Sequence, residues 1–175
     1  MNFLRKISNW KTLGILFVIY VLFAVFVMSG MMGSGDIKIT PLDLLFSYSP
    51  ERAYALLSSY GELREHYAFM SLTADTAYPI IYTVLFMVLL MVLAKSLWPD
   101  RPNRHRLALV PLFAFVFDLI ENHNIRTLLH GYPEKLDGVV KTASTFTSLK
   151  WISVGTTFAL IILLVLLLLV KRFKK

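Results

Sequence analysis

The sequence contains no cysteine and few charged residues. Without a thiol, the chain has no disulfide, no thiolate metal ligand and no cysteine nucleophile. Charged residues make up 17% of its 175 residues, whereas 57% are hydrophobic. A soluble domain of this length needs far more polar surface to cover its core. The composition therefore predicts one integral membrane domain.

Spacings typical of a histidine metal site are also missing. The four histidines, at positions 66, 105, 123 and 130, form no His-x-x-x-His or Glu-x-x-His pair. His123 follows Asn122 but points to another side of a helix, and a lone histidine usually has a structural or solvated role. We therefore expect no metal and no cofactor.

Four segments are long and apolar enough to cross a membrane, which takes about 20 residues in a helix. They comprise residues 12–32, 78–98, 107–129 and 151–170. The first and last contain no charge, and Lys95 lies near one end of the second, where its side chain can reach the headgroups. The predicted fold class is all-α, a bundle of four transmembrane helices.

Basic residues gather at alternate ends of these segments. Asp100 is the single acid among eleven of the 18 bases, which are Arg5, Lys6, Lys11, Lys95, Arg101, Arg104, Arg106, Lys171, Arg172, Lys174 and Lys175. The other segments hold seven bases and ten of the 11 acids. The positive-inside rule therefore predicts that both termini and the 99–106 loop are cytoplasmic. Tryptophans at three span ends (10, 98 and 151) match an aromatic belt.

The net charge of +7 has a membrane explanation. The bases flank apolar segments and form no stripe with interleaved aromatic residues, which a nucleic-acid groove requires. Bases in such positions contact anionic headgroups. We expect membrane lipids as partners and no nucleic acid.

The long outer connection, residues 33–77, has the pattern of a folded helical loop. Thr40-Pro41 and Ser49-Pro50 each place a capping hydroxyl before a proline at a first helical position. An amphipathic helix follows, with apolar residues at helical spacing: Ala53, Leu56, Leu57, Tyr60 and Leu63. It either lies on the membrane surface or caps the bundle, and its weakly basic polar face favours the cap. Gly61 weakens or ends it.

The shorter outer connection, residues 131–146, shapes two helices. Gly131-Tyr132-Pro133 is expected to end the third helix, and residues 139–150 have a pattern that extends the fourth helix outward. The small residues Ala143, Ser144, Thr147 and Ser148 form a face suited to close helix packing.

Polar and charged residues, which are unfavourable inside a membrane, gather in the outer half of the predicted bundle. Asp118, Glu121, Asn122 and Arg126 have i, i+3, i+4 and i+8 spacing, so they share one face of a helix. Counting from Leu107 at about 1.5 Å per residue puts Asp118 near the middle of the membrane. The second and fourth segments bring further polar residues to the same half: Asp75, Tyr78, Tyr82 and Lys150.

A charge in the bilayer core costs several kcal/mol, so intramembrane charges usually face the protein interior and mark functional sites. The acids must therefore be protonated or pair with Lys150 or Arg126. One interpretation is a satisfied network that fixes helix packing. The leading functional hypothesis is a non-catalytic pocket for a lipid headgroup or small polar molecule, with Asp75, Asp118 and Glu121 as acceptors and the tyrosines as donors.

Three alternatives remain open at this point. The first is an intramembrane lipid-modifying enzyme that uses the carboxylates as acid and base. The second is a proton-coupled transporter, which requires a pathway to both faces. The third is a purely structural subunit of a homo-oligomer or a larger membrane complex.

Four blocks of sequence carry a resemblance: YSPERAYALL (48–57), DTAYPIIY (75–82), FDLIEN (117–122) and FTSLKW (146–151). Together they resemble a family of small bacterial four-helix integral membrane proteins to which no activity is assigned. The resemblance covers most of residues 40–151 and implies a four-helix fold in the bacterial cytoplasmic (plasma) membrane. At the level of fold alone, the chain also resembles the emopamil-binding and sigma-2 receptor group.

Overall fold

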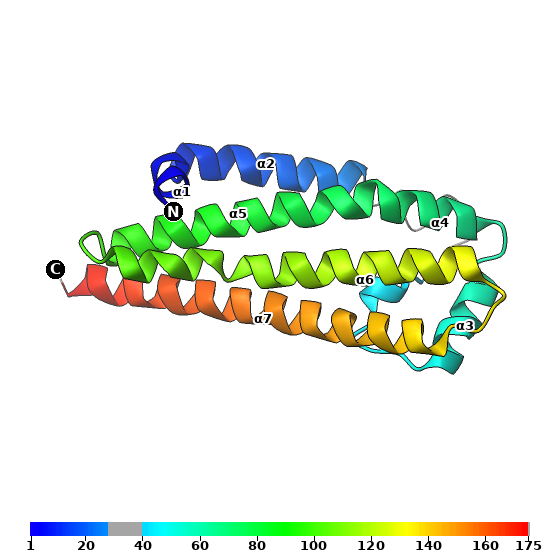
Figure 1. Ribbon diagram of the computed structural model, residues 1–175. Coiled ribbons are helices and arrows are strands. Elements are labelled where there is room, and N and C mark those ends of the chain that lie inside the picture. The colour runs from blue at the N-terminus through cyan, green and yellow to red at the C-terminus, as the bar shows by residue number, and fades with distance from the viewer. Residues whose placement is uncertain (28–39, 175) are drawn as a thin grey trace.

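The computed structural model describes residues 1–27 and 40–174, and this part of the chain is helical, without a strand (Figure 1). The end of the predicted 12–32 segment, the start of the 33–77 loop and Lys175 lie outside the described residues. Three helical stretches are long and apolar enough to cross a membrane: Leu63–Leu97, Pro102–Gly131 and Asp137–Phe173. The all-α class is therefore confirmed, and the chain is consistent with a membrane protein.

Four helices run side by side: α2 contacts α5, and α5, α6 and α7 contact one another (Figure 1). Helix α1, the 3-10 helix η3 and the end of α7 lie at one end of the molecule, and α3 lies at the other. In chain order the elements are α1 (Asn2–Ile7), α2 (Trp10–Phe26), η2 (Leu42–Leu44), α3 (Pro50–Ser59), α4 (Leu63–Leu72), α5 (Ala74–Leu97), η3 (Pro102–Leu109), α6 (Pro111–Gly131) and α7 (Asp137–Phe173).

Local signals account for several helix ends in the connections. Ser49 caps α3 by accepting a hydrogen bond from Arg52 N at 3.3 Å, and Pro50 is the first helical residue, as the sequence predicts. Gly61 separates α3 from α4 with a φ of 52°, a conformation that glycine adopts at little cost. Thr40-Pro41 behaves differently from the prediction, because only the short η2 follows and no side chain caps it.

Helix α7 is 37 residues long, or about 55 Å. It therefore exceeds the roughly 30 Å of a hydrocarbon core, and it begins well before the apolar segment 151–170, as the predicted extension requires. Helix α6 ends at Gly131, also as predicted. Of the small residues in the extension, Ala143, Ser144 and Thr147 are buried, so this face packs against the rest of the protein.

Two apolar cores lie on either side of the predicted polar residues. At the α3 end, Leu56 and Leu57 on the apolar face of α3 form one core with Leu128 of α6 and Val140 of α7. Helix α3 therefore covers this end of the α6–α7 pair, in agreement with the cap interpretation. The second core, near the chain termini, comprises Leu90, Met91, Leu93, Leu97, Ala108 and Leu164.

Exposed side chains change from polar to apolar along the bundle. On α7 the exposed large apolar residues begin at Trp151, whereas the exposed side chains before it are those of Asp137, Lys141, Thr142 and Thr145. On α6 the exposed residues Leu112, Phe113 and Val116 are followed by His123, Thr127 and His130. We call the apolar part of this surface, on α2, α5, α6 and α7, the apolar band. Six large apolar residues are exposed outside it, at positions 1, 3, 44, 46, 69 and 72.

The predicted polar residues lie at the edge of the apolar band. Lys150 directly precedes Trp151 on α7, and Asp118 and Glu121 fall between Val116 and His123 on α6. Counting residues from Leu107 predicts a more central position for Asp118. The depth of Asp118 in a membrane stays a prediction, because the exposed surface of the helices defines the band and not the position of a bilayer.

Candidate functional site

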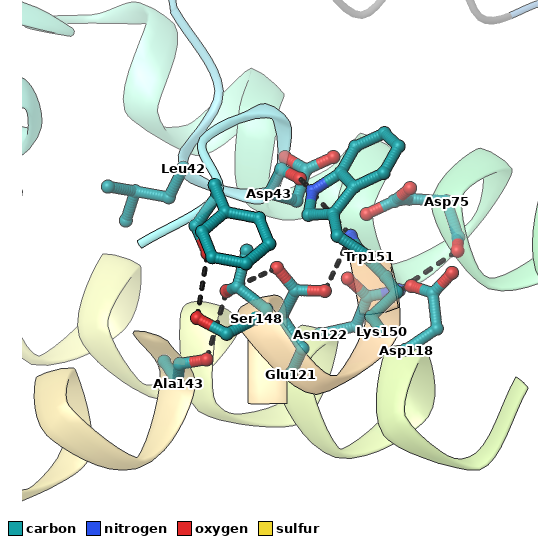
Figure 2. A network of polar contacts seen from close by, with 12 residues as sticks. Leu42, Asp43, Asp75, Asp118, Glu121, Asn122, Ala143, Ser148, Lys150 and Trp151 are labelled. Atoms are coloured by element: carbon teal, nitrogen blue, oxygen red, sulfur yellow. Dashed lines mark hydrogen bonds and ion pairs between the residues drawn. The ribbon is translucent and has the colours of Figure 1, made fainter. Parts of the chain in front are cut away.

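An ion pair joins α6 to α7 in the interior. Lys150 Nζ lies 2.6 Å from Glu121 Oε2, and the two side chains are 8% and 0% exposed (Figure 2). The hydroxyl of Thr147, one turn before Lys150, donates to Glu121 Oε1 at 2.7 Å. The carboxylate of Glu121 is thus bound through both oxygens, which offsets the cost of burying its charge.

Tyr48, from the loop before α3, approaches the same place. Its hydroxyl lies 3.5 Å from Thr147 Oγ1, and its backbone N–H donates to Ser144 Oγ at 2.8 Å. Burial raises the pKa of Tyr48 above its ordinary value, so the phenol keeps its proton at neutral pH. The loop is thereby attached to the small-residue face of α7.

Asp118 has its own donors. Tyr82 OH donates to Asp118 Oδ2 at 2.8 Å, and Asn122 Nδ2 lies 3.2 Å from Asp118 Oδ1. Asn122 Nδ2 also donates to the backbone oxygen of Asp75 at 3.0 Å. That oxygen has no partner four residues later in α5, because position 79 is proline and lacks an N–H. Asn122 therefore satisfies a carbonyl that Pro79 leaves free.

Asp43 is a member of this cluster that sequence reasoning missed. Its backbone oxygen accepts from Lys150 Nζ at 3.2 Å and from Trp151 Nε1 at 3.1 Å, and its Oδ1 accepts from Tyr67 OH at 2.8 Å (Figure 2). Tyr67 OH in turn accepts from Leu42 N at 3.2 Å. These tertiary bonds hold η2 over the ion pair. The acid in an otherwise apolar stretch, Leu42 to Phe46, was the available signal.

Two predicted residues contact partners other than the acids. Arg126 Nη1 donates to the backbone oxygen of Ser71 at 3.1 Å, near the C-terminal end of α4, where a cation is favourable. Among the described residues Arg126 forms no ion pair, so the structure connects it to α4 and not to a carboxylate. Tyr78 OH lies 2.9 Å from Tyr20 OH of α2, and their rings stack. Sequence reasoning also missed Tyr20, because an uncharged apolar segment carries no polar pattern.

A pocket of about 230 Å³ opens beside these residues. Five of the predicted residues line it, namely Asp75, Tyr78, Tyr82, Asp118 and Lys150, together with Asp43 and Tyr20. The rest of the wall is largely apolar and includes Phe86, Trp151 and Phe158. Three predicted residues do not line it: Glu121, Asn122 and Arg126.

The carboxylate of Asp75 stands out on this wall. The residue is only 5% exposed, yet no described residue donates a hydrogen bond to its side chain. Figure 2 shows its carboxylate without a dashed contact, whereas its backbone oxygen is bound. Buried polar atoms usually have a partner, so this acceptor is available to a bound molecule.

Within the described residues, no three His, Asp or Glu side chains come together as ligands of one metal ion. No protein-family model, curated protein or solved structure matches the chain. The fold belongs to the class of helical proteins with several candidate membrane-spanning helices. Within that class, the residues of the pocket are the basis for assigning a function.

Proposed function

We propose that this chain is a multi-pass membrane protein of the bacterial cytoplasmic membrane that binds the polar head of a lipid or a small polar molecule. Four helices cross the membrane, α2 being the first, and both termini are cytoplasmic. Helix α2 has 17 described residues, or about 25 Å of helix. The basic residues at the termini and in the 99–106 loop support this orientation.

The depth of the pocket supports a ligand at the level of the headgroups. Its polar wall coincides with the edge of the apolar band, and its apolar wall continues into that band at Phe86 and Phe158. In this orientation the edge lies in the outer leaflet. A molecule there has its polar part beside the acids and its apolar part beside the aromatic rings.

The Asp75 carboxylate is the observation that carries the proposal. In a purely structural network each buried acceptor has a donor within the protein. The buried carboxylate of Asp75 has no donor among the described residues and lines a pocket. The predicted residues accordingly divide into two groups. Glu121, Asn122 and Arg126 hold the helices together and do not line the pocket, whereas Asp75 and Asp118 line it. Asp118 also accepts from Tyr82 and Asn122, and Asp75 accepts from no described side chain.

Native mass spectrometry of the purified protein tests the proposal through Asp75→Asn and Asp118→Asn. Both variants are expected to lose about tenfold or more of the copurifying lipid or small molecule, because each loses a carboxyl group that ionises when the bound head pairs with it. A hydrogen bond to a charged group contributes about 1.5–3 kcal/mol, which corresponds to a tenfold change or more. Asp137→Asn, at an exposed position on α7, is the matched control and retains the ligand.

Thermal unfolding of the same samples separates binding from folding. Asp75→Asn removes no hydrogen bond within the described protein, so its melting temperature without ligand is expected to equal that of the wild type. Equal retention by the wild type and both pocket variants would reject the proposal. A retained molecule that changes mass during incubation with the wild type, but not with Asp118→Asn, would replace binding with lipid modification.

A further inference from the structure

An apolar groove lies beside the pocket, along α2. It has a volume of about 490 Å³ and lies between α2, α5 and Phe158 of α7. Leu13 and Gly14 line it from α2, and Leu85 and Leu89 line it from α5. Tyr20, Phe86 and Phe158 line both the groove and the pocket, so the two spaces adjoin at these side chains.

Two sets of contacts hold α2 and the residues before it to α5, one on each side of the groove. At one end Lys95 Nζ donates to the backbone oxygens of Ser8 at 2.9 Å and Arg5 at 3.1 Å. At the other end Tyr20 and Tyr78 form their hydroxyl contact. No described residue of α2 is buried, although the helix lies along α5 (Figure 1).

The middle of α2 leaves open space beside Gly14. A Cβ atom added there meets no atom within 4 Å, and the position lies between the two fastened ends. From Trp10 to Tyr20 the helix extends about 15 Å. This length suits an alkyl chain lying parallel to the helix axis better than a compact ligand.

We infer that the groove holds the hydrocarbon chain of an amphiphile whose organic amine head occupies the pocket. This inference rests on the proposed function and names the class of ligand. The pocket alone, at about 230 Å³, is smaller than the roughly 300–1,000 Å³ of most small-molecule sites. Pocket and groove together fall within that range.

The charges around the pocket select the head. Asp43, Asp75 and Asp118 line it, and its one lining base, Lys150, is already paired with Glu121. A positively charged amine supplies the countercharge with which these acids ionise in an apolar surrounding, and it supplies the hydrogen-bond donors that Asp75 lacks among the described residues. Among the described residues no three acids are grouped as ligands of one metal ion, and an amine, unlike a metal ion, also carries an alkyl chain for the groove. A phosphate or carboxylate head supplies neither the countercharge nor the donors.

Photocrosslinking in phosphatidylcholine nanodiscs tests the position of the chain. The probe is hexadecylamine with a diazirine near the end of its chain. It is expected to label residues 13–17 of α2 and 85–89 of α5 preferentially. Gly14→Leu fills the groove and is expected to reduce this labelling about tenfold, whereas Gly155→Leu is the matched control. Gly155 is also a helical glycine without a neighbour within 4 Å, on the exposed side of α7. Labelling spread evenly over the apolar band would overturn the inference.

Competition by unlabelled compounds tests the head and its source. Excess hexadecylamine is expected to prevent labelling, whereas hexadecanol and palmitate are not. Phosphatidylethanolamine that competes identifies a membrane lipid as the source of the amine, and competition by free amine alone identifies a soluble amphiphile. Equal competition by palmitate would overturn the inference.

Butylamine separates this inference from the proposed function. It is expected to bind the wild type and Gly14→Leu equally, because it needs only the pocket, and to bind Asp75→Asn more weakly. If Asp75→Asn loses its copurifying molecule but no amine binds the wild type, the amphiphile inference fails and the proposed function stands. If Asp75→Asn also retains that molecule, both fail.

Discussion

Glu121 and Lys150 form an ion pair of 2.6 Å between α6 and α7, with both side chains almost completely removed from solvent. Taking two charges out of water is expensive, so such a pair contributes little net stability over an apolar alternative. Removing one partner is different, because the remaining charge stays buried without compensation. The main effect of the pair on stability is therefore that loss of either residue alone is costly.

We predict that Glu121→Gln and Lys150→Met each lower the free energy of unfolding by about 3–5 kcal/mol, the usual cost of breaking a buried pair. The double variant is expected to lose much less than the sum of the two, because no unpaired charge remains. Denaturation in detergent micelles, followed by circular dichroism, measures all three. Additive losses would show that the two residues act independently.

The bond between Asn122 and the Asp75 carbonyl predicts a coupling between Asn122 and Pro79. Asn122→Ala leaves this buried oxygen without a donor, which costs about 1–3 kcal/mol. In Pro79→Ala, residue 79 gains an N–H that is able to donate to the same oxygen within α5. The second substitution is therefore expected to recover part of the stability lost in the first.

A double-mutant cycle measures this coupling. The recovery is expected to be partial, because Asn122 also binds Asp118 at 3.2 Å, a contact that Pro79→Ala does not replace. Pro79→Ala in combination with Thr145→Ala, an exposed site on α7, is the control and is expected to show no coupling. A cycle without interaction energy would mean that water donates to the Asp75 carbonyl when Asn122 is absent.

Two glycines are expected to respond in opposite ways to alanine. Gly61 has a φ of 52°, and a side chain in this conformation costs about 1–2 kcal/mol. Gly155 lies inside α7 with open space around it, where alanine stabilises a helix by about 0.5–1 kcal/mol. Melting temperatures in the same detergent should fall for Gly61→Ala and rise for Gly155→Ala. A fall for both would indicate a packing role for Gly155.

The proposed orientation predicts which positions are reached from outside the cell. Because the sequence has no cysteine, Lys6→Cys, Asn103→Cys and Lys141→Cys each introduce a single exposed thiol. A membrane-impermeant maleimide is expected to label position 141 in intact cells, and positions 6 and 103 only after permeabilisation. Labelling of position 6 in intact cells would mean that α2 does not cross the membrane and that three helices do.

Local patterns in the sequence determined the helical class and several helix boundaries. The Ser49-Pro50 start of α3, the break at Gly61 and the end of α6 at Gly131 follow from conformational preferences of a few neighbouring residues. Such preferences act over one or two turns. They are therefore readable without the fold, as is the amphipathic face of α3.

The sequence also indicated which residues are energetically unfavourable in a membrane, because a charge in an apolar helix is conspicuous wherever it occurs. Spacing placed Asp118, Glu121 and Asn122 on one face of a helix. It did not reveal that Glu121 and Asn122 bind other helices while Asp118 faces a pocket. That division depends on which neighbour approaches each side chain.

Only the tertiary structure brought Asp43 and Tyr20 to the cluster, from a loop and from an uncharged helix. Only it left Asp75 without a donor in the described part of the chain and opened the groove beside Gly14. These features arise where segments distant in sequence meet or fail to meet, so no local pattern encodes them. The four predicted spans and their direction came from the sequence, and the shape of the space between them came from the packing of the helices.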